Sequence, residues 1–297
     1  MEIFVTGATG AVGRPLTLAL ERAGHEVVAA TRRPDTYDGV GRPERFDLDG
    51  GEAGQPLAPL DPDGAGSTCD AAYYLVHALD QEDFATVDRR RAERFADWWG
   101  PARPLVYLGG LGAEDTPSAH LSSRHEVGTI LRARCHTVEL RASLMIGAES
   151  LSFRLLARLG ELAGHSPLSV PVPEAATTRT QPIGQDDLVK LLVAALDVAP
   201  GSYDIGGPDV VTYADLIERS ARAQGEDLHT ASVVPVDARW AGPATALLAG
   251  TDPWATSALL AGMGTEAVVR PGHELPDGLT ATMRLDDAIE VALAAAV

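Results

Sequence analysis

Two residues in the middle of the chain could take part in chemistry together: His120 as a proton donor and Arg124 as a fixed positive charge. They lie four positions apart in the stretch HLSSR, inside a predicted helix over residues 117–134, so both side chains lie on one helix face. An unperturbed imidazole titrates at about pH 6.5, so His120 could give a proton to a substrate oxygen. Arg124 can hold a ribose and supply positive charge, but it is neither an acid nor a base near neutrality. The alternative is that His120 lies on the helix surface without a chemical role.

A glycine-rich turn near the start of the chain predicts where a nucleotide would bind. The stretch FVTGATGAVG places Gly7, Gly10 and Gly13 three residues apart, after a short apolar run and before a predicted helix. In that context the first glycine permits a tight turn, the second lets the backbone approach a pyrophosphate, and the third lets helix and strand pack closely. The helix N-terminus adds unpaired N–H groups and about half a positive charge. The other residues of this predicted phosphate loop are Thr9, Ala11 and Val12.

The end of the predicted second strand, over residues 25–33, indicates which dinucleotide binds. NAD-binding proteins usually place a carboxylate there, to bond the ribose 2′-hydroxyl. This strand ends instead in Thr31, Arg32 and Arg33. Because arginine binds phosphate bidentately, the sequence favours NADP(H) over NAD(H). The alternative is that both arginines are solvated surface groups.

Asp47 and Leu48 follow a short predicted strand over residues 44–49, where they would flank the adenine. The alternative for Asp47 is that it caps a turn.

The elements that must position these residues alternate between strand and helix. Alternation of this kind predicts a parallel sheet covered by helices on both faces, with ligands at the carboxyl ends of the strands. The fold class is therefore α/β, a doubly wound Rossmann sheet, and residues 1–147 complete it. The predicted strands are 2–7, 25–33, 44–49, 69–79, 103–111 and 136–147, and the predicted helices are 11–24, 80–99 and 117–134.

Residues 148–297 follow a looser pattern, which we interpret as a smaller substrate-binding lobe packed on the same domain. Helices are expected over 149–162, 185–199, 212–225 and 283–296, with a strand over 201–207. Several large apolar residues of this half would form either a lid over the nicotinamide or a packed core. These residues are Trp240, Leu247, Leu248, Trp254 and Met263.

Composition excludes several classes of function. The 297 residues carry a formal net charge of −18, which disfavours binding to nucleic acid or to anionic membrane surfaces. Cys69 and Cys135 lie far apart without metal-ligand spacing, so we expect buried thiols, no disulfide and no metal site. The chain shows no signal peptide and no apolar run of about 18 residues, so a cytoplasmic protein is expected.

The motif TGATGAVG, over residues 6–13, resembles the short-chain dehydrogenase/reductase superfamily, and its atypical, NmrA-like branch fits best. Supporting stretches are AYYLVHAL (72–79), SSRHEVG (122–128), LRASLMIG (140–147), QPIGQDDLVKLLVAAL (181–196) and YDIGGPDVVTY (203–213). The resemblance implies three groups of residues along the cofactor. Leu75, Val76 and His77 would lie along a ribose, Leu108, Gly109 and Gly110 near the nicotinamide, and Ile146 and Gly147 on its other side.

The chain departs from the superfamily at the position of the catalytic Tyr-x-x-x-Lys pair. His120 stands at the tyrosine position and Arg124 at the lysine position, while LGGL supplies no hydroxyl at the serine position. His125 and Glu126 follow, and a solvated helix face is the favoured interpretation of both.

Four functions stay open from the sequence. The protein reduces a carbonyl or conjugated alkene with NADPH, using His120 or water as the acid, or it transfers hydride without a side-chain acid. Alternatively, it binds NADP(H) as a non-catalytic sensor, or it carries out epimerase-like or lyase chemistry on the same fold. An enzyme acting on a small apolar molecule is favoured. A homodimer through the helix at 81–99 would be compatible with the pattern, but nothing in it requires one.

Overall fold

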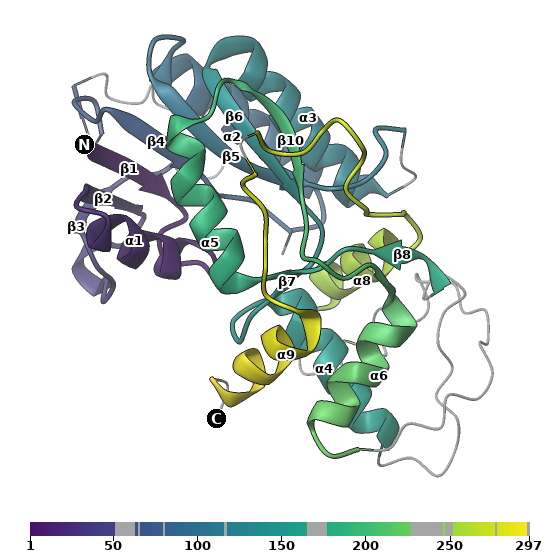
Figure 1. Ribbon diagram of the computed structural model, residues 1–297. Coiled ribbons are helices and arrows are strands. Elements are labelled where there is room, and N and C mark those ends of the chain that lie inside the picture. Colours follow the sequence, from purple (N-terminus) through teal and green to yellow (C-terminus); the bar gives the residue numbers. More distant parts are fainter. Residues whose placement is uncertain are drawn as a thin grey trace.

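A computed structural model describes residues 1–50, 63–64, 66–79, 81–115, 118–164, 177–226, 246, 252–276 and 278–295. Figure 1 shows a central sheet flanked by helices, with a group of helices beyond one end of the strands. No helix among the described residues has the length and apolar character needed to cross a bilayer.

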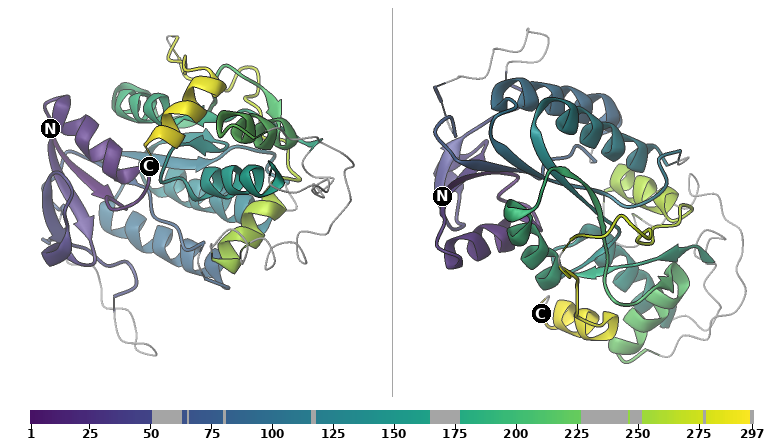
Figure 2. Two further views of the ribbon diagram at one scale, coloured as in Figure 1. Left: turned by 90° about the horizontal axis from the view of Figure 1, so that it is seen from below. Right: turned by 45° about the horizontal axis from the view of Figure 1, so that its top comes forward.

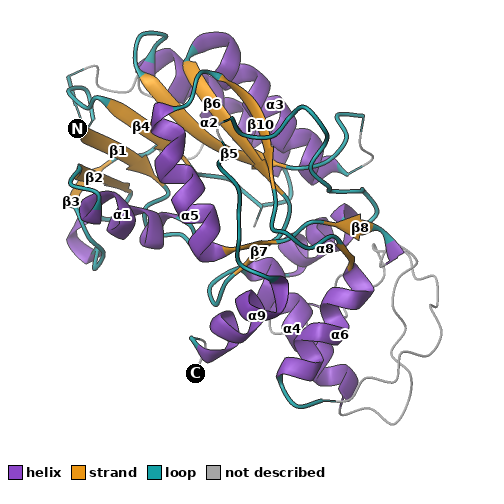
Figure 3. Cartoon of the chain, in the orientation of Figure 1, coloured by secondary structure: helices purple, strands orange, loops and turns teal. Residues whose placement is uncertain are grey.

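The central sheet has seven parallel strands in the order β10-β6-β5-β4-β1-β2-β3 (Figure 3). The order reverses between β1 and β4, and ligands of such sheets bind at the carboxyl ends of the strands beside that reversal. The strands are β1 (Glu2–Thr6), β2 (Glu26–Thr31), β3 (Arg42–Arg45), β4 (Ala71–Tyr74), β5 (Pro104–Gly110), β6 (His136–Ala142) and β10 (Gly201–Ile205). The predicted Rossmann fold is confirmed.

Helices cover both faces of this sheet (Figure 2). On one face α1 (Gly13–Arg22) and α5 (Gln185–Ala194) pack over apolar side chains of β1, β2 and β6. On the other face α2 (Phe84–Trp99) and α3 (Ala119–Arg134) pack against each other and over β4 and β5. The fully buried Tyr73 and Tyr74 point into these two cores, one into each, because successive strand residues face opposite sides.

The C-terminal half supplies both the last strand and a separate helical core. β10 is the seventh strand of the sheet, while α4 (Leu151–Gly164), α6 (Tyr213–Ala223), α8 (Pro253–Gly262) and α9 (Leu285–Ala294) enclose a core of their own. Short strands tie this lobe together: β7 (Met145–Ile146) with β9 (Ile183–Gly184), and β8 (Arg179–Thr180) with β11 (Val211–Thr212). Short 3₁₀ turns among the described residues are η1 (Pro34–Thr36) and η3 (Ala195–Asp197). The division of the chain at residue 147 stays a prediction.

Several predicted elements are shorter in the structure. The strand expected over 136–147 ends at Ala142, because its neighbour β5 ends opposite, at Gly110. The chain then leaves the sheet, and Ile183 donates to the Leu144 carbonyl (3.0 Å). The strand expected over 44–49 ends at Arg45, since Asp47 accepts a hydrogen bond from the backbone of Asp49 (3.0 Å) and closes a turn.

Both cysteines are free and buried, as predicted. Burial raises the pKa of the Cys69 thiol to about 12 and that of Cys135 to about 11, so neither is a nucleophile near neutrality. No group of three or more potential metal ligands gathers among the described side chains.

Candidate functional site

The glycine loop between β1 and α1 has the geometry of a phosphate cradle. Gly7 adopts a left-handed conformation (φ 70°), and its carbonyl accepts a hydrogen bond from the Gly10 backbone (2.9 Å). A Cβ atom at Gly13 would lie 2.1 Å from the Gly7 carbonyl oxygen, so only glycine fits there. At Gly10 a Cβ would meet only that oxygen, at 3.3 Å, and otherwise point into open space. α1 has neither a side-chain cap nor an acidic residue in its first turn. Because the Arg14 N–H bonds the Gly10 carbonyl (3.1 Å) and Pro15 has no N–H, the Gly13 N–H is the group of this turn left for an anion.

Two cavities meet at this loop and share Gly7, Gly10, Leu75 and His77 as common walls. The first, of about 540 Å³, lies beyond β2 and is mainly polar. The second, of about 350 Å³, runs from the glycine loop past the ends of β5 and β6 into the C-terminal lobe. The two cavities adjoin at the point where the strand order reverses, and we call them together the cleft.

The polar cavity has two arginines with no ion-pair partner among the described residues, Arg32 and Arg33. Two of its acidic side chains pair with other arginines: Asp38 with Arg14 (2.7 Å), and Asp49 with Arg91 (Oδ1 to Nε, 2.9 Å), while Asp47 accepts from the Asp49 backbone (3.0 Å). Hydrogen bonds and charge from those arginines lower the pKa of the Asp38 and Asp49 carboxyls. Positive charge is therefore available for an anion at the end of β2.

His120 lies half-buried in the wall of the second cavity, near the ring of Phe84 (centroids 6.5 Å apart). Burial, and then the neighbouring charges of Arg124 and His77, lower the pKa of His120 to about 3. The imidazole is neutral near pH 7, so it can donate an N–H hydrogen bond but is not a reservoir of an acidic proton there.

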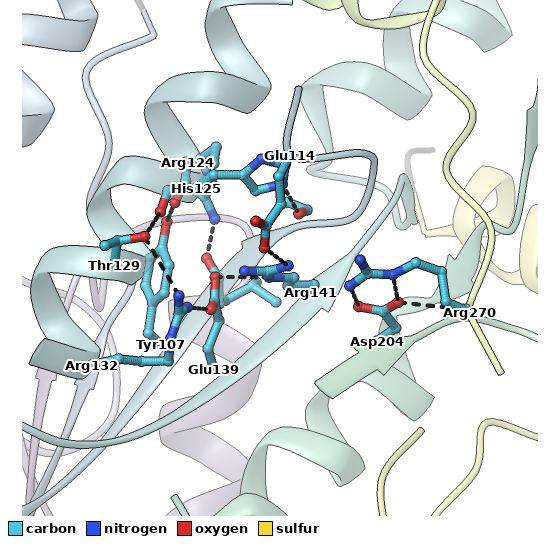
Figure 4. A network of polar contacts seen from close by, with 12 residues as sticks. Tyr107, Glu114, Arg124, His125, Thr129, Arg132, Glu139, Arg141, Asp204 and Arg270 are labelled. Atoms are coloured by element: carbon cyan, nitrogen blue, oxygen red, sulfur yellow. Dashed lines mark hydrogen bonds and ion pairs between the residues drawn. The ribbon is translucent and has the colours of Figure 1, made fainter. Parts of the chain in front are cut away.

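Arg124 lies in the same wall and is held from two sides (Figure 4). Its guanidinium donates to the Leu108 carbonyl and lies 5.4 Å from the centre of the Tyr107 ring. The Tyr107 hydroxyl in turn donates to the Arg124 carbonyl (3.0 Å). A buried tyrosine thus fixes the one arginine among the described residues that line this cavity.

Behind Arg124 a buried carboxylate, Glu139, pairs with Arg132 and Arg141 (3.3 Å to Arg141). Figure 4 shows this group between α3 and the strands β5 and β6. A Cβ at Gly109 would lie 2.6 Å from the Glu139 carboxylate, and one at Gly128 would lie 2.3 Å from it. Gly109 therefore makes room for Glu139 as well as lining the cavity.

The structure brings nearly all the predicted site residues to this cleft. The polar cavity is lined by Gly7, Thr9, Gly10, Thr31, Arg32, Arg33, Asp47, Leu48, Leu75, Val76 and His77. The second is lined by Gly7, Gly10, Ala11, Val12, Gly13, Leu75, His77, Leu108, Gly109, Gly110, His120 and Arg124. That a residue lines one of these cavities does not test the role predicted for it.

Ile146 lies elsewhere. Its side chain is 2% exposed and packs in the apolar core of the C-terminal lobe, while the preceding Leu144 and Met145 line the cavity.

His125 corrects another expectation. It is 7% exposed rather than solvated, and its Nε2 lies 3.1 Å from the Gly110 carbonyl oxygen. Glu126 pairs with Arg89 at the surface (2.6 Å). Among the suggested lid residues, Met263 lines the cavity and Trp254 is exposed, while Trp240, Leu247 and Leu248 lie outside the described residues.

Sequence reasoning missed three hydroxyl-bearing parts of the cavity wall: Ser143, the pair Ser150 and Ser152, and Tyr213. Ser143 carried a usable signal, because it follows a predicted central strand and strand ends line the sites of such sheets. Tyr213 begins a helix in the second half of the chain, and no local pattern connects it to the glycine loop.

The comparisons with known proteins agree with this fold. A model described as the NAD dependent epimerase/dehydratase family matches residues 3–55, which is less than half of the chain. No curated protein sequence matches.

Among solved structures, UDP-N-acetylglucosamine 4-epimerase from Bacillus cereus is 13% identical, with a TM-score of 0.63 over 99% of this chain and 96% of that one. The Bordetella bronchiseptica enzyme WbmG, in complex with NAD and UDP, is 14% identical, with a TM-score of 0.65 over 98% and 93%. UDP-glucose 4-epimerase from Thermus thermophilus, in complex with NAD, is 16% identical, with a TM-score of 0.61 over 99% and 98%. At such identities the likeness shows the fold.

Proposed function

We propose that this protein is an NADP(H)-dependent oxidoreductase of the atypical, NmrA-like kind, reducing a carbonyl or conjugated alkene of a small apolar molecule. The observation that supports this best is the shape of the cleft. A polar cavity with two arginines that pair with no described residue adjoins a largely apolar cavity at a glycine loop, with Leu108, Gly109 and Arg124 just beyond the junction. The first cavity suits the phosphorylated adenosine half of a dinucleotide, and the second suits the nicotinamide and a substrate.

The residues present fit NADP(H). The open side of Gly10 and the uncapped start of α1 would hold the diphosphate. Arg32 and Arg33 would hold the 2′-phosphate, because guanidinium groups match phosphate oxygens and no carboxylate stands at the end of β2. Structural relatives are described in complex with NAD, so the preference for the phosphorylated form rests on these two arginines.

The chemistry of the site centres on charge. Bound NADPH would supply a hydride to the substrate. Arg124, fixed by Tyr107, would stabilise the negative charge that develops on the substrate oxygen, and the neutral His120 would donate an N–H to the same oxygen. Since the pKa of His120 is about 3, the proton that completes the reduction would come from water.

The substrate class follows from the wall of the second cavity. Its described lining includes Leu144, Met145, Leu155, Leu156, Leu260 and Met263. Relatives of this fold include enzymes named for nucleotide sugars, whose diphosphate requires several cationic or donor groups. Arg124 is the one arginine or lysine among the described residues of this wall, and a wall with a single cationic side chain favours an apolar substrate.

Turnover tests this proposal directly. The purified protein is mixed with NADPH and a panel of quinones, enones and ketones, and with UDP-glucose as the competing class, while absorbance at the NADPH band is followed. Sustained NADPH oxidation with an apolar carbonyl or alkene is the expected result. Chemical conversion of UDP-glucose alone would contradict the substrate class.

The second candidate is a non-catalytic NADP(H)-binding sensor. The replacement of the Tyr-x-x-x-Lys pair by His120 and Arg124 favours it, since neither residue is a proton donor near neutrality. Tight NADPH binding with no turnover across the panel would support this candidate.

A further inference from the structure

One wall of the apolar cavity carries a run of hydroxyl groups from three separate elements. Ser143 follows β6, Thr180 ends β8, and Tyr213 begins α6. The Ser143 Oγ lies 3.1 Å from the Thr180 Oγ1 and 2.9 Å from the Gln181 carbonyl oxygen. Ser143 and Tyr213 line the cavity, whereas Thr180 is fully buried behind them.

The direction of these hydrogen bonds follows from the number of hydrogens. A carbonyl oxygen only accepts, so Ser143 donates its single hydrogen to Gln181. Thr180 must then donate its single hydrogen to Ser143.

The hydroxyl hydrogens of Ser143 and Thr180 are therefore both committed inside the protein, while Ser143, which lines the cavity, keeps an unused lone pair. A hydroxyl oxygen has two lone pairs, and Thr180 occupies one of those on Ser143. A ligand that only accepts hydrogen bonds would have to turn the Ser143 hydroxyl away from the Gln181 carbonyl, leaving that carbonyl without this partner.

We propose that Ser143 is a specificity-determining residue that accepts a hydrogen bond from a hydroxyl or N–H group of the ligand. The inference deepens the proposed function, and the role of Ser143 in turnover rests on that function. The substrate is then an apolar molecule that also bears a hydrogen-bond donor, such as a phenol. Ser143 directly follows the end of β6, next to the end of β5, and it lines the same cavity as Arg124. The donor group of the ligand therefore binds near the reacting group.

Two probes of nearly equal shape test the inference. 2-Naphthol donates and accepts through its oxygen, whereas 2-methoxynaphthalene only accepts. The dissociation constants of both are measured by ligand-observed NMR on the full chain, first without nucleotide and then with saturating NADP⁺. We expect 2-naphthol to bind about threefold more tightly or better, which corresponds to one net hydrogen bond. No preference for 2-naphthol, or no binding of it, would overturn the inference.

Two variants test whether Ser143 causes the preference for 2-naphthol over 2-methoxynaphthalene. In Ser143→Ala the ratio of the two dissociation constants should fall to about one, while binding of 2-methoxynaphthalene stays within about twofold. Ser152→Ala is the matched control: it makes the same change in the same cavity, at a hydroxyl paired with Ser150 (3.2 Å), and should keep the preference. A preference that survives Ser143→Ala, or that Ser152→Ala also removes, contradicts the assignment to Ser143.

The wild-type ratio still tests the inference if a variant fails to fold, as a thermal melt would show. Failure of the proposed function is separately visible. A protein that does not bind NADP⁺ but still prefers 2-naphthol keeps the recognition site and loses only its role in an NADP(H)-dependent reaction.

Discussion

At the scale of single residues, the cofactor preference depends on Arg32 and Arg33. Both lie exposed in the polar cavity, and neither is committed to an ion pair with a described residue. Replacing both with Ala should weaken NADPH binding tenfold or more while changing NADH binding by about twofold at most, because each lost charged contact to phosphate contributes about 1 kcal/mol or more. Titration calorimetry with each nucleotide measures this. Arg22→Ala, at an exposed position in the last turn of α1, is the matched control. Equal losses for NADPH and NADH would contradict a role in reading the 2′-phosphate.

His120 makes a prediction about stability and pH. Its pKa is about 3 in the folded protein, against the ordinary 6.5, so the unfolded chain binds a proton that the folded chain does not over the interval between these values. Stability must therefore fall as pH falls through that interval. Between pH 7 and pH 5 the free energy of unfolding of the wild type should drop by about 1 to 2 kcal/mol more than that of His120→Phe. Urea unfolding at both pH values measures the difference. Parallel pH dependence of the two proteins would show that His120 is not held neutral by burial.

At the scale of elements, the glycine loop contains one glycine that packing requires, Gly13, and one that we expect to face the ligand, Gly10. Gly13→Ala would force a Cβ to 2.1 Å from the Gly7 carbonyl oxygen, so the β1–α1 unit must shift. We expect a loss of several kcal/mol of stability, about the size of other severe overpacking effects. Gly10→Ala meets one atom at 3.3 Å and should fold with nearly unchanged stability. Its nucleotide affinity should nevertheless fall tenfold or more, because the methyl group would occupy the place of the diphosphate. Thermal melts and NADPH titrations of both variants make the comparison, and normal NADPH binding by Gly10→Ala would contradict the placement of the diphosphate.

Two walls of the cleft are joined through Asp88 of α2, which is 4% exposed. Its carboxylate accepts from the Ala78 backbone (2.8 Å), in the loop that carries His77, and from Ser123 (3.4 Å), beside Arg124 on α3. Burial raises the pKa of Asp88, and the hydrogen bond from Ala78 and the charges of Arg124 and Arg91 oppose that rise.

Asp88→Ala should therefore lower NADPH affinity by about tenfold, since the loop and the helix lose their common anchor. Asp88→Asn should restore most of that affinity, because its amide oxygen still accepts from Ala78. Ser123→Ala and Ser122→Ala form a matched pair, in which only the buried Ser123 contacts Asp88. Fluorescence titration with NADPH ranks the four variants. If Asp88→Asn were as weak as Asp88→Ala, the anchor would depend on charge rather than on the hydrogen bond to Ala78.

At the scale of the whole molecule, local sequence predicted the elements of both halves better than it predicted how they assemble. The helices expected over 149–162, 185–199, 212–225 and 283–296 correspond to α4, α5, α6 and α9. Short apolar runs such as residues 3–5 identify central parallel strands, and Gly24 marks the end of the first helix unit with a positive φ of 87°. The extra partner of β6 was harder to foresee. β10 reaches the sheet only after two further helices, and its pairing with β6 is a long-range contact that no local pattern encodes.

The residues of the candidate site divide in the same way, into those that local sequence predicts and those that only the assembled fold brings together. Gly7, Gly10 and Gly13 were predictable because their spacing follows from the turn itself. Gly109 was assigned to the nicotinamide, but its fit to the buried Glu139 emerges only when β5, β6 and α3 are assembled. Ser143 and Thr180 come from segments far apart in the chain, so only the folded structure brings their hydroxyl groups together.

The central claim is that the cleft at the glycine loop binds NADP(H), and titration calorimetry of the unmodified chain tests it most directly. NADPH, NADP⁺ and NADH are each titrated up to millimolar concentration under one buffer condition. The structure leads us to expect saturable binding of NADPH and NADP⁺ at a stoichiometry near one, at least about tenfold tighter than that of NADH. Absence of a saturable heat with any of the three nucleotides at millimolar concentration would contradict it.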